Sequence, residues 1–140
     1  MISAYVDTNV LLRYLTADDP AHSPAAAVLL TEAEAGNLQL ILTETTVAEV
    51  VWVLQRAYRY SRAQIGDGLR SLILSEGIIG LDSDVCMVAL DIFEREPLDF
   101  TDALLAAQAL VRGPRAICSF DRDFDRVRGV QRLEPGRAIP

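Results

Sequence analysis

The amino-acid sequence predicts an α/β fold, a three-layer α/β/α sandwich around a central, mostly parallel sheet of four to five strands. Short apolar runs alternate with longer segments of helical periodicity along the whole chain. These apolar runs are continuous rather than interrupted by polar residues, which is typical of strands buried on both faces. At 140 residues, without a repeat or a linker, the chain suits one core. We therefore expect a single domain over residues 1–140.

The expected elements follow one another in regular order. Residues 2–6 form the first strand, and a helix begins near Thr8. Ser23 is the expected N-cap of a second helix, which ends at Gly36. Further strands are expected at 38–43, 78–81, 116–119 and 129–133, and further helices at 46–60, 62–75, 83–96 and 101–110.

The composition narrows the possible chemistry. The chain has no lysine, so all 13 basic residues are arginine, and His22 is its single histidine. Mechanisms that need a catalytic lysine, a histidine base or a His-rich metal site are therefore disfavoured. Carboxylates are plentiful, because 20 residues are Asp or Glu. The sequence thus favours a site built from acids.

The net charge of −7 at first argues against a nucleic-acid partner, because phosphate binding is mostly an electrostatic interaction with basic patches. Two Mg²⁺ ions bound to clustered acids would add +4 and leave −3 for the loaded protein (−7 + 4 = −3). A nucleic-acid partner therefore remains open.

Several features of the sequence indicate an intracellular, cytoplasmic protein. No apolar stretch approaches the roughly 18–20 residues that a membrane span needs. The N-terminus lacks the basic start and cleavage site of a signal peptide. Cys86 and Cys118 lie among apolar neighbours and are expected to be reduced core residues.

Four acids are expected at one edge of the sheet. Asp7 directly follows the first strand, and Asp121 follows the fourth. Glu49 and Asp102 lie in the first turns of helices that should begin at the same edge. Ligands of open parallel sheets bind beyond the carboxyl ends of the strands. Clustered carboxylates repel one another unless a cation intervenes, and Mg²⁺ or Mn²⁺ prefers oxygen ligands.

Most of these acids also have a purely structural interpretation. Glu49 would complete a capping box that starts at Thr46. Asp102 would stabilise a helix N-terminus through the helix dipole, and Asp121 would belong to a solvated turn. Asp7 is harder to explain in this way, because it ends a buried strand. Four acids on one predicted edge make function the better interpretation.

Four segments of the chain, in order, resemble the PIN-domain ribonucleases, and among these the VapC toxins of bacterial toxin–antitoxin pairs. They are Tyr-Val-Asp-Thr-Asn at 5–9, Val-Ala-Glu-Val at 47–50, Phe-Thr-Asp-Ala-Leu at 100–104 and Ser-Phe-Asp-Arg-Asp-Phe at 119–124. The likeness extends over nearly the whole chain. The first and last segments together are fairly specific, whereas the middle two alone would be weak.

The resemblance implies a PIN-like α/β/α fold and Mg²⁺- or Mn²⁺-dependent endonucleolytic hydrolysis of RNA. It also implies a cognate antitoxin partner, docking near the apolar residues 10–35, and a homodimer or a dimer-based hetero-oligomer. The family's acidic quartet corresponds to Asp7, Glu49, Asp102 and Asp121, and its small polar positions to Thr8 or Asn9 and Ser119. Asp123 and Asp125 either support the site from outside the metal ligands or belong to a turn.

Arginines near Asp121 are candidate RNA contacts, because guanidinium groups bind phosphate in a bidentate manner. Ordinary solvated surface explains them equally well. They are Arg112, Arg115 and Arg122, followed by Arg126 and Arg128.

Three other classes of protein compete with a nuclease. A phosphoacceptor receiver domain also binds Mg²⁺ at the ends of parallel strands, but that family uses a lysine, which this chain lacks. Haloacid-dehalogenase-like phosphatases carry a second Asp two residues after the first, where this chain has Asn9. A catalytically silent PIN-like RNA-binding or scaffold protein remains open, and only the intact quartet argues against it.

Overall fold

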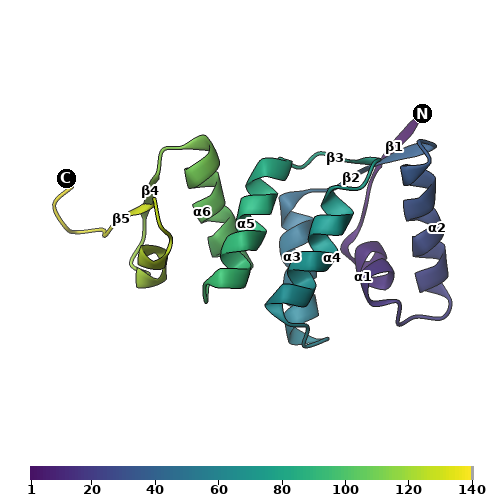
Figure 1. Cartoon of the computed structure of the whole chain (residues 1–140), viewed down its shortest axis with the longest axis horizontal. Coiled ribbons are helices and arrows are strands. Elements are labelled where there is room, and N and C mark those ends of the chain that lie inside the picture. The colour runs from purple at the N-terminus through teal and green to yellow at the C-terminus, as the bar shows by residue number, and fades with distance from the viewer. Residues whose placement is uncertain (140) are drawn as a thin grey trace. The chain divides into compact units, whose positions relative to one another are not determined.

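The computed structural model describes residues 1–139 (Figure 1). Five strands and six α-helices form within these residues, together with one 3-10 helix. The strands are β1 (Ile2–Tyr5), β2 (Leu38–Ile41), β3 (Ile78–Ile79), β4 (Ala116–Cys118) and β5 (Gln131–Leu133). The helices are α1 (Thr8–Thr16), α2 (His22–Glu34), α3 (Glu44–Arg56), α4 (Arg62–Ile73), α5 (Ser83–Arg95), α6 (Phe100–Arg112) and the 3-10 helix η1 (Arg122–Arg126). No helix within the described range is both long and apolar enough to cross a membrane.

The first of two compact units comprises Met1–Leu81. Its strands form a parallel sheet in the order β1-β2-β3, with Ile2 opposite Leu38 and Leu40 opposite Ile78. Helix α1 packs on α2 and α3, and α2 packs against β2. Leu11, Leu40, Leu42, Val50, Leu54 and Leu69 are buried in its core. Packing of these apolar side chains is what supports the sheet edge from which α1 begins.

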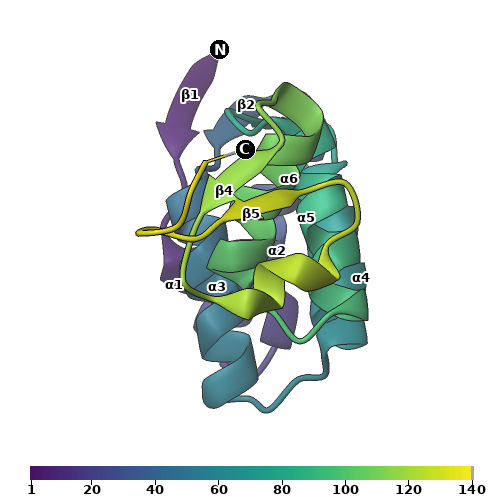
Figure 2. The same cartoon turned by 90° about the vertical axis from the view of Figure 1, so that its left-hand side faces the viewer.

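The second unit begins at Asp82. Helices α5 and α6 pack closely, and the rings of Phe93 and Phe100 meet edge to face with centroids 5.9 Å apart. Strands β4 and β5 pair in parallel, with Cys118 opposite Leu133. Figure 2 shows these two strands side by side, and η1 packs against β5. Leu98, Ala106, Ile117, Phe124 and Val127 form a buried cluster beneath the turn that follows β4.

The predicted α/β class and the parallel pairing of strands are confirmed. Each of the five predicted strand regions contains a strand, and every observed pairing is parallel. In the described residues these strands form one sheet of three and another of two. The connection from β2 to β3 passes through two helices, which is the crossover that parallel neighbours require.

Three local predictions are wrong. Strand β1 was expected to be buried, but all four of its residues are exposed, and it is the edge strand of its sheet. Ser23 is not the N-cap of α2: the N-cap is Ala21 and the helix begins at His22, because the Asp19 carboxylate accepts the backbone N–H of Ala21 at 2.9 Å and of His22 at 2.8 Å. An ionised carboxylate is the stronger acceptor, so it satisfies the first amides of the helix ahead of the serine. Cys86 is buried as predicted, whereas Cys118 on β4 is exposed.

Candidate metal centre

Asp7 stands at the junction between β1 and α1. It is the N-cap residue of α1, with extended backbone angles, yet its side chain accepts no capping hydrogen bond. Its backbone carbonyl accepts the N–H groups of Val10 at 3.1 Å and Leu11 at 3.4 Å, so the helix begins without help from the carboxylate. The Asp7 carboxylate is therefore available to a ligand, at the end of the helix where the dipole is positive.

Glu49 is not part of a capping box. Helix α3 begins at Glu44, and its N-cap is Thr43, whose hydroxyl accepts the Thr46 N–H at 3.3 Å. Glu49 therefore lies in the second turn of α3, beyond the reach of the N-cap amide. The structural interpretation of Glu49 from the sequence is wrong, because it assigned the start of the helix to Thr46.

A hydrogen bond joins the first of these regions to the second. The hydroxyl of Thr8, a residue that is only 8% exposed, donates to Glu49 Oε2 at 3.0 Å across 41 residues of sequence. Because Thr8 directly follows Asp7, this bond ties the β1–α1 junction to α3. The sequence prediction gave this supporting position to Thr8 or Asn9; Asn9 is exposed and lines a pocket between α1 and α2.

In the second unit, Asp102 lies in the first turn of α6 and is partly buried. Burial raises the pKa of its carboxyl, and the negative charges of Asp99, Asp121 and Asp123 raise that pKa further. Three neighbouring acids therefore act on the Asp102 carboxyl in this unit. Such repulsion is relieved when a cation binds.

Asp99 is a member of this group that the sequence interpretation missed. It is the N-cap of α6, but its side chain makes no capping hydrogen bond. The sequence interpretation began the helix at Thr101 and so treated Asp99 as part of a loop. Its position three residues before Asp102, directly ahead of an apolar helix, is the signal that places both acids in one turn.

Asp121 lies in a turn held by its own side chains. The Ser119 hydroxyl accepts the Asp121 N–H at 2.9 Å, and Asp121 Oδ1 accepts the Asp123 N–H at 2.8 Å, which caps η1. The structural interpretation of Asp121 as a turn residue is thus correct for Oδ1, which is engaged within the turn. Asp123 pairs with Arg126 at 3.5 Å, and Asp125 pairs with Arg132.

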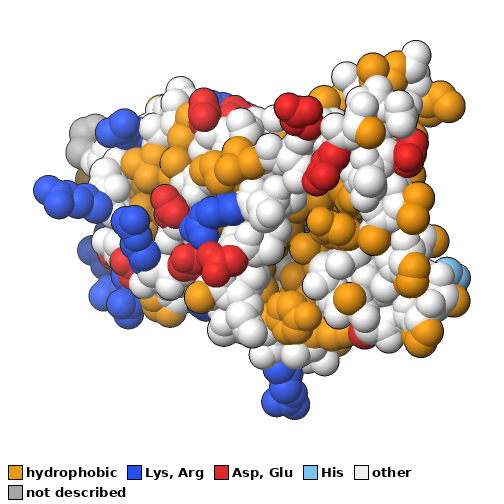
Figure 3. All heavy atoms as spheres, turned by 45° about the vertical axis from the view of Figure 1, so that its right-hand side comes forward, with side chains coloured by type: hydrophobic (Ala, Val, Ile, Leu, Met, Phe, Trp, Pro, Cys, Tyr) orange, Lys and Arg blue, Asp and Glu red, His pale blue; other side chains and the backbone are white. Residues whose placement is uncertain are grey.

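The candidate RNA-contacting arginines differ in their partners. Arg112 binds Asp82 at 3.1 Å, so its guanidinium already has an ionic partner. Arg115 and Arg122 are exposed and form no ion pair within residues 1–139. Because the chain has no lysine, blue in Figure 3 marks only arginine, and several such side chains project from the surface.

The donor chemistry of these acids fits a hard divalent cation. Every candidate ligand is a carboxylate, which suits Mg²⁺ or Mn²⁺ and disfavours metals that prefer sulfur or nitrogen. Asp7 and Glu49 lie in the first unit, and Asp102 and Asp121 in the second. In the part of the chain that the structure describes, no three Asp, Glu, His or Cys side chains are gathered closely enough to hold an ion.

Parallel strands followed by acidic residues at their carboxyl ends are typical of α/β proteins, whose ligands bind beyond those strand ends. Residues 4–130 match the model of the PIN domain, and the chain belongs to that family. This assignment separates it from the receiver domains and the dehalogenase-like phosphatases.

One solved structure similar to this chain is the crystal structure of VapBC2 from Rickettsia felis bound to a DNA fragment from their promoter. It is 13% identical, with a TM-score of 0.37, over 96% of this chain and 98% of that chain. No curated protein matches the sequence.

Proposed function

We propose that this protein is a Mg²⁺- or Mn²⁺-dependent endoribonuclease of the VapC type, the cytoplasmic toxin of a toxin–antitoxin pair. Its proposed metal-binding acids are Asp7, Glu49, Asp102 and Asp121. The observation that carries the proposal is the PIN-domain match over residues 4–130, which includes all four. Two further facts support it: neither the Asp7 carboxylate nor that of Glu49 caps a helix, so capping does not explain them.

The proposal includes one domain over residues 1–140, in which both pairs of acids serve the same site. The family match supports this, because it continues without a break from the first unit into the second. Four carboxylates in one site would repel one another unless a cation were bound, so metal binding should stabilise the folded protein.

When bound, the metal supplies Lewis-acid assistance to water and to the phosphodiester. The residues of the chain orient the ligands. The Thr8 hydroxyl donates to Glu49 Oε2, which leaves the other carboxylate oxygen for the ion. The Ser119 hydroxyl fixes the Asp121 backbone, and Asp121 Oδ1 is engaged by the Asp123 amide, which leaves Oδ2 for the ion. A carboxylate without metal would accept the proton of the attacking water.

The proposed substrate is RNA, gripped through its phosphates by arginine. Arg115 and Arg122 suit this role better than Arg112, because Arg112 is already paired with Asp82. Arg122 directly follows Asp121, so a phosphate bound there lies near the proposed metal ligand. The guanidinium geometry fits a phosphate with two parallel hydrogen bonds.

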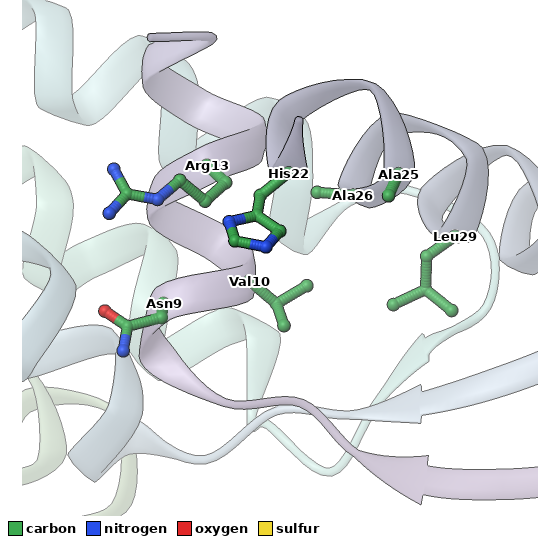
Figure 4. Close-up of a pocket in the computed structure, with 7 residues that line it drawn as sticks. All are labelled: Asn9, Val10, Arg13, His22, Ala25, Ala26 and Leu29. Atoms are coloured by element: carbon green, nitrogen blue, oxygen red, sulfur yellow. The ribbon is translucent and has the colours of Figure 1, made fainter. Parts of the chain in front are cut away.

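The proposed antitoxin site is a pocket of about 530 Å³ between α1 and α2, inside the region expected for docking. Figure 4 shows Val10 and Leu29 pointing into the space between the two helices, with Asn9 and Arg13 on the α1 side. An apolar side chain of a partner would fill the pocket. Arg13 already pairs with Asp18 at 3.2 Å, so the apolar side chains would provide most of the contact. Copurification with a small neighbour-encoded protein, lost in Val10→Asp, would support this. We also propose that the protein forms a homodimer or a dimer-based hetero-oligomer, which light scattering would test.

A metal titration followed by RNA cleavage tests the function. Wild-type protein should bind Mn²⁺ and cleave single-stranded RNA only with Mg²⁺ or Mn²⁺ present. Asp7→Asn and Asp102→Asn, one from each unit, should each lower cleavage by about 100-fold or more, since removing even a partner of a ligand costs 10–100-fold. Asp67→Asn, which changes an exposed aspartate of α4, is the matched control and should cleave normally.

The outcome with single variants also tests the shared site. If Asp7→Asn binds Mn²⁺ as tightly as wild type while Asp102→Asn does not, the two pairs of acids do not share an ion. If wild-type protein cleaves no RNA with either metal, the nuclease function is wrong. The silent PIN-like scaffold then becomes the better interpretation.

A further inference from the structure

We propose that Arg132 is a positioning residue that fixes the turn carrying Asp121, and that it thereby sets the metal affinity of the site. This inference rests on the proposed function for the metal, but its geometry is independent of it. Arg132 is the central residue of β5, and its side chain is only 12% exposed. A guanidinium group so little exposed needs partners for its donors, because burying an unpaired charge is costly.

The partners of Arg132 lie at both ends of the turn. Its Nε and Nη2 donate to the two carboxylate oxygens of Asp125 at 3.0 and 3.3 Å. Its Nη1 donates to the backbone carbonyl of Ser119 at 3.0 Å and to Glu134 Oε1 at 3.2 Å. One rigid planar group therefore joins the residue two before Asp121 to the residue four after it.

The interior of the turn is fixed by the bonds already described. The Ser119 N–H also donates to the Leu133 carbonyl at 3.1 Å, so two residues of β5, Arg132 and Leu133, form hydrogen bonds with Ser119 at the start of the turn. Between Ser119 and Asp125, the only regular structure is the short helix η1, which Asp121 itself caps. The direction of the Asp121 carboxylate thus depends on hydrogen bonds made by side chains. Arg132 adds to them by linking Ser119 and Asp125, the two ends of the turn.

Charge gives Arg132 a second effect on the same turn. Asp121, Asp123 and Asp125 place three negative charges within five residues. The bidentate pair with Arg132 neutralises Asp125 and turns its carboxylate toward β5. A cation would then be held by Asp121 without competition from Asp125. Lysine cannot replace this arrangement, because its ammonium group lacks the planar fork of donors.

The test compares Arg132→Lys with Arg137→Met. Arg137 also pairs with Glu134, but it makes no hydrogen bond to the turn, so it is a matched control for the loss of an ion pair. We expect Arg132→Lys to weaken Mn²⁺ binding by about 10-fold, the lower end of the cost of removing a direct partner of a metal ligand, because Arg132 contacts the turn and not Asp121 itself. Arg137→Met should bind Mn²⁺ like wild type.

A second measurement needs no metal. In the metal-free protein, hydrogen exchange of the Asp121 and Asp123 amides should be faster in Arg132→Lys than in Arg137→Met, while the amides of α5 exchange equally. Asp125→Asn, which keeps one acceptor but removes the charge, should give an intermediate Mn²⁺ affinity and serves if Arg132→Lys does not fold.

The possible results separate the two proposals. If wild-type protein binds no Mn²⁺, the proposed function fails, and the amide exchange still decides the role of Arg132. If wild type binds Mn²⁺ and Arg132→Lys and Asp125→Asn bind it equally well, the positioning role is wrong. Equal acceleration of exchange throughout the second unit would also overturn it, because that result describes a general loss of stability.

Discussion

The structures that hold the proposed metal-binding acids differ between the two units. Asp7 and Glu49 belong to the unit of residues 1–81, and Asp121 belongs to the unit that begins at Asp82. The first two stand on regular structure, at a strand–helix junction and in the second turn of α3. Asp121 stands in a turn whose shape depends on hydrogen bonds from Ser119 and Arg132. Regular secondary structure thus fixes the positions of Asp7 and Glu49, whereas side-chain hydrogen bonds fix that of Asp121. The position of Asp121 should therefore be the more sensitive to single substitutions.

The largest expected effect tests whether the two units are one domain. Phe93→Ala removes a buried ring from the second unit and should lower the free energy of unfolding by about 3–5 kcal/mol. Trp52, the only tryptophan, reports on the first unit, where Arg56 lies 5.7 Å from its ring centroid. If the units unfold together, Phe93→Ala should lower the urea midpoint measured by Trp52 fluorescence.

Leu69→Ala is the control for this measurement, because Leu69 is buried in the same unit as Trp52. It should lower the midpoint by both fluorescence and circular dichroism. The single domain would be contradicted if Phe93→Ala left the fluorescence midpoint unchanged and if the circular dichroism of that variant changed in two separate steps with urea.

The next effect compares the two hydroxyl groups that support the acids. Thr8→Val removes the donor to Glu49, and Mn²⁺ binding should weaken by about 10-fold. Ser119→Ala removes the acceptor for the Asp121 amide, and the loss should be greater, toward about 100-fold, because that turn contains only the short helix η1 and no α-helix. Thr8→Ser keeps the hydroxyl and should restore binding. Equal losses of Mn²⁺ affinity in Thr8→Val and Ser119→Ala would contradict the expectation that the Asp121 turn is the more sensitive region.

The same contrast explains how much could be predicted from the sequence. Strand positions, parallel pairing and Asp7 follow from apolar runs and from the residues that end them, which are local patterns. The role of Arg132 does not, because Ser119 and Asp125 meet it through the pairing of β4 with β5, which no local pattern encodes. Glu49 was misinterpreted for a related reason: Thr43 and Thr46 both have the chemistry of an N-cap, and the tertiary context selects Thr43.

A smaller effect tests that assignment of the cap. Thr43→Ala should destabilise the protein by about 1 kcal/mol, the usual cost of losing an N-cap side chain, and leave Mn²⁺ binding unchanged. Glu49→Gln should do the reverse and lose Mn²⁺ affinity without a cost in stability. Thermal unfolding and a Mn²⁺ titration of both variants measure this. Destabilisation by Glu49→Gln equal to that of Thr43→Ala would return Glu49 to a capping role.

The smallest effect concerns the pKa of Asp102, which is raised above its ordinary value by burial and by its acidic neighbours. The folded protein therefore holds this proton more tightly than the unfolded chain. Its stabilising contribution is present at low pH and is lost as the pH rises through the raised pKa. At pH 7 the ionised carboxylate disfavours folding, so Asp102→Asn should raise the Tm of the metal-free protein slightly, and the difference from wild type should shrink toward pH 4.

Asp84→Asn is the matched control, since Asp84 lies in the first turn of α5 and should lose only a favourable interaction with the helix dipole. With Mn²⁺ the order should reverse, because wild type gains stability from the ion and Asp102→Asn does not. A lower Tm for metal-free Asp102→Asn at pH 7, as for Asp84→Asn, would mean that the helix dipole outweighs the repulsion among the acids. That result would contradict the picture of a site strained until a cation binds.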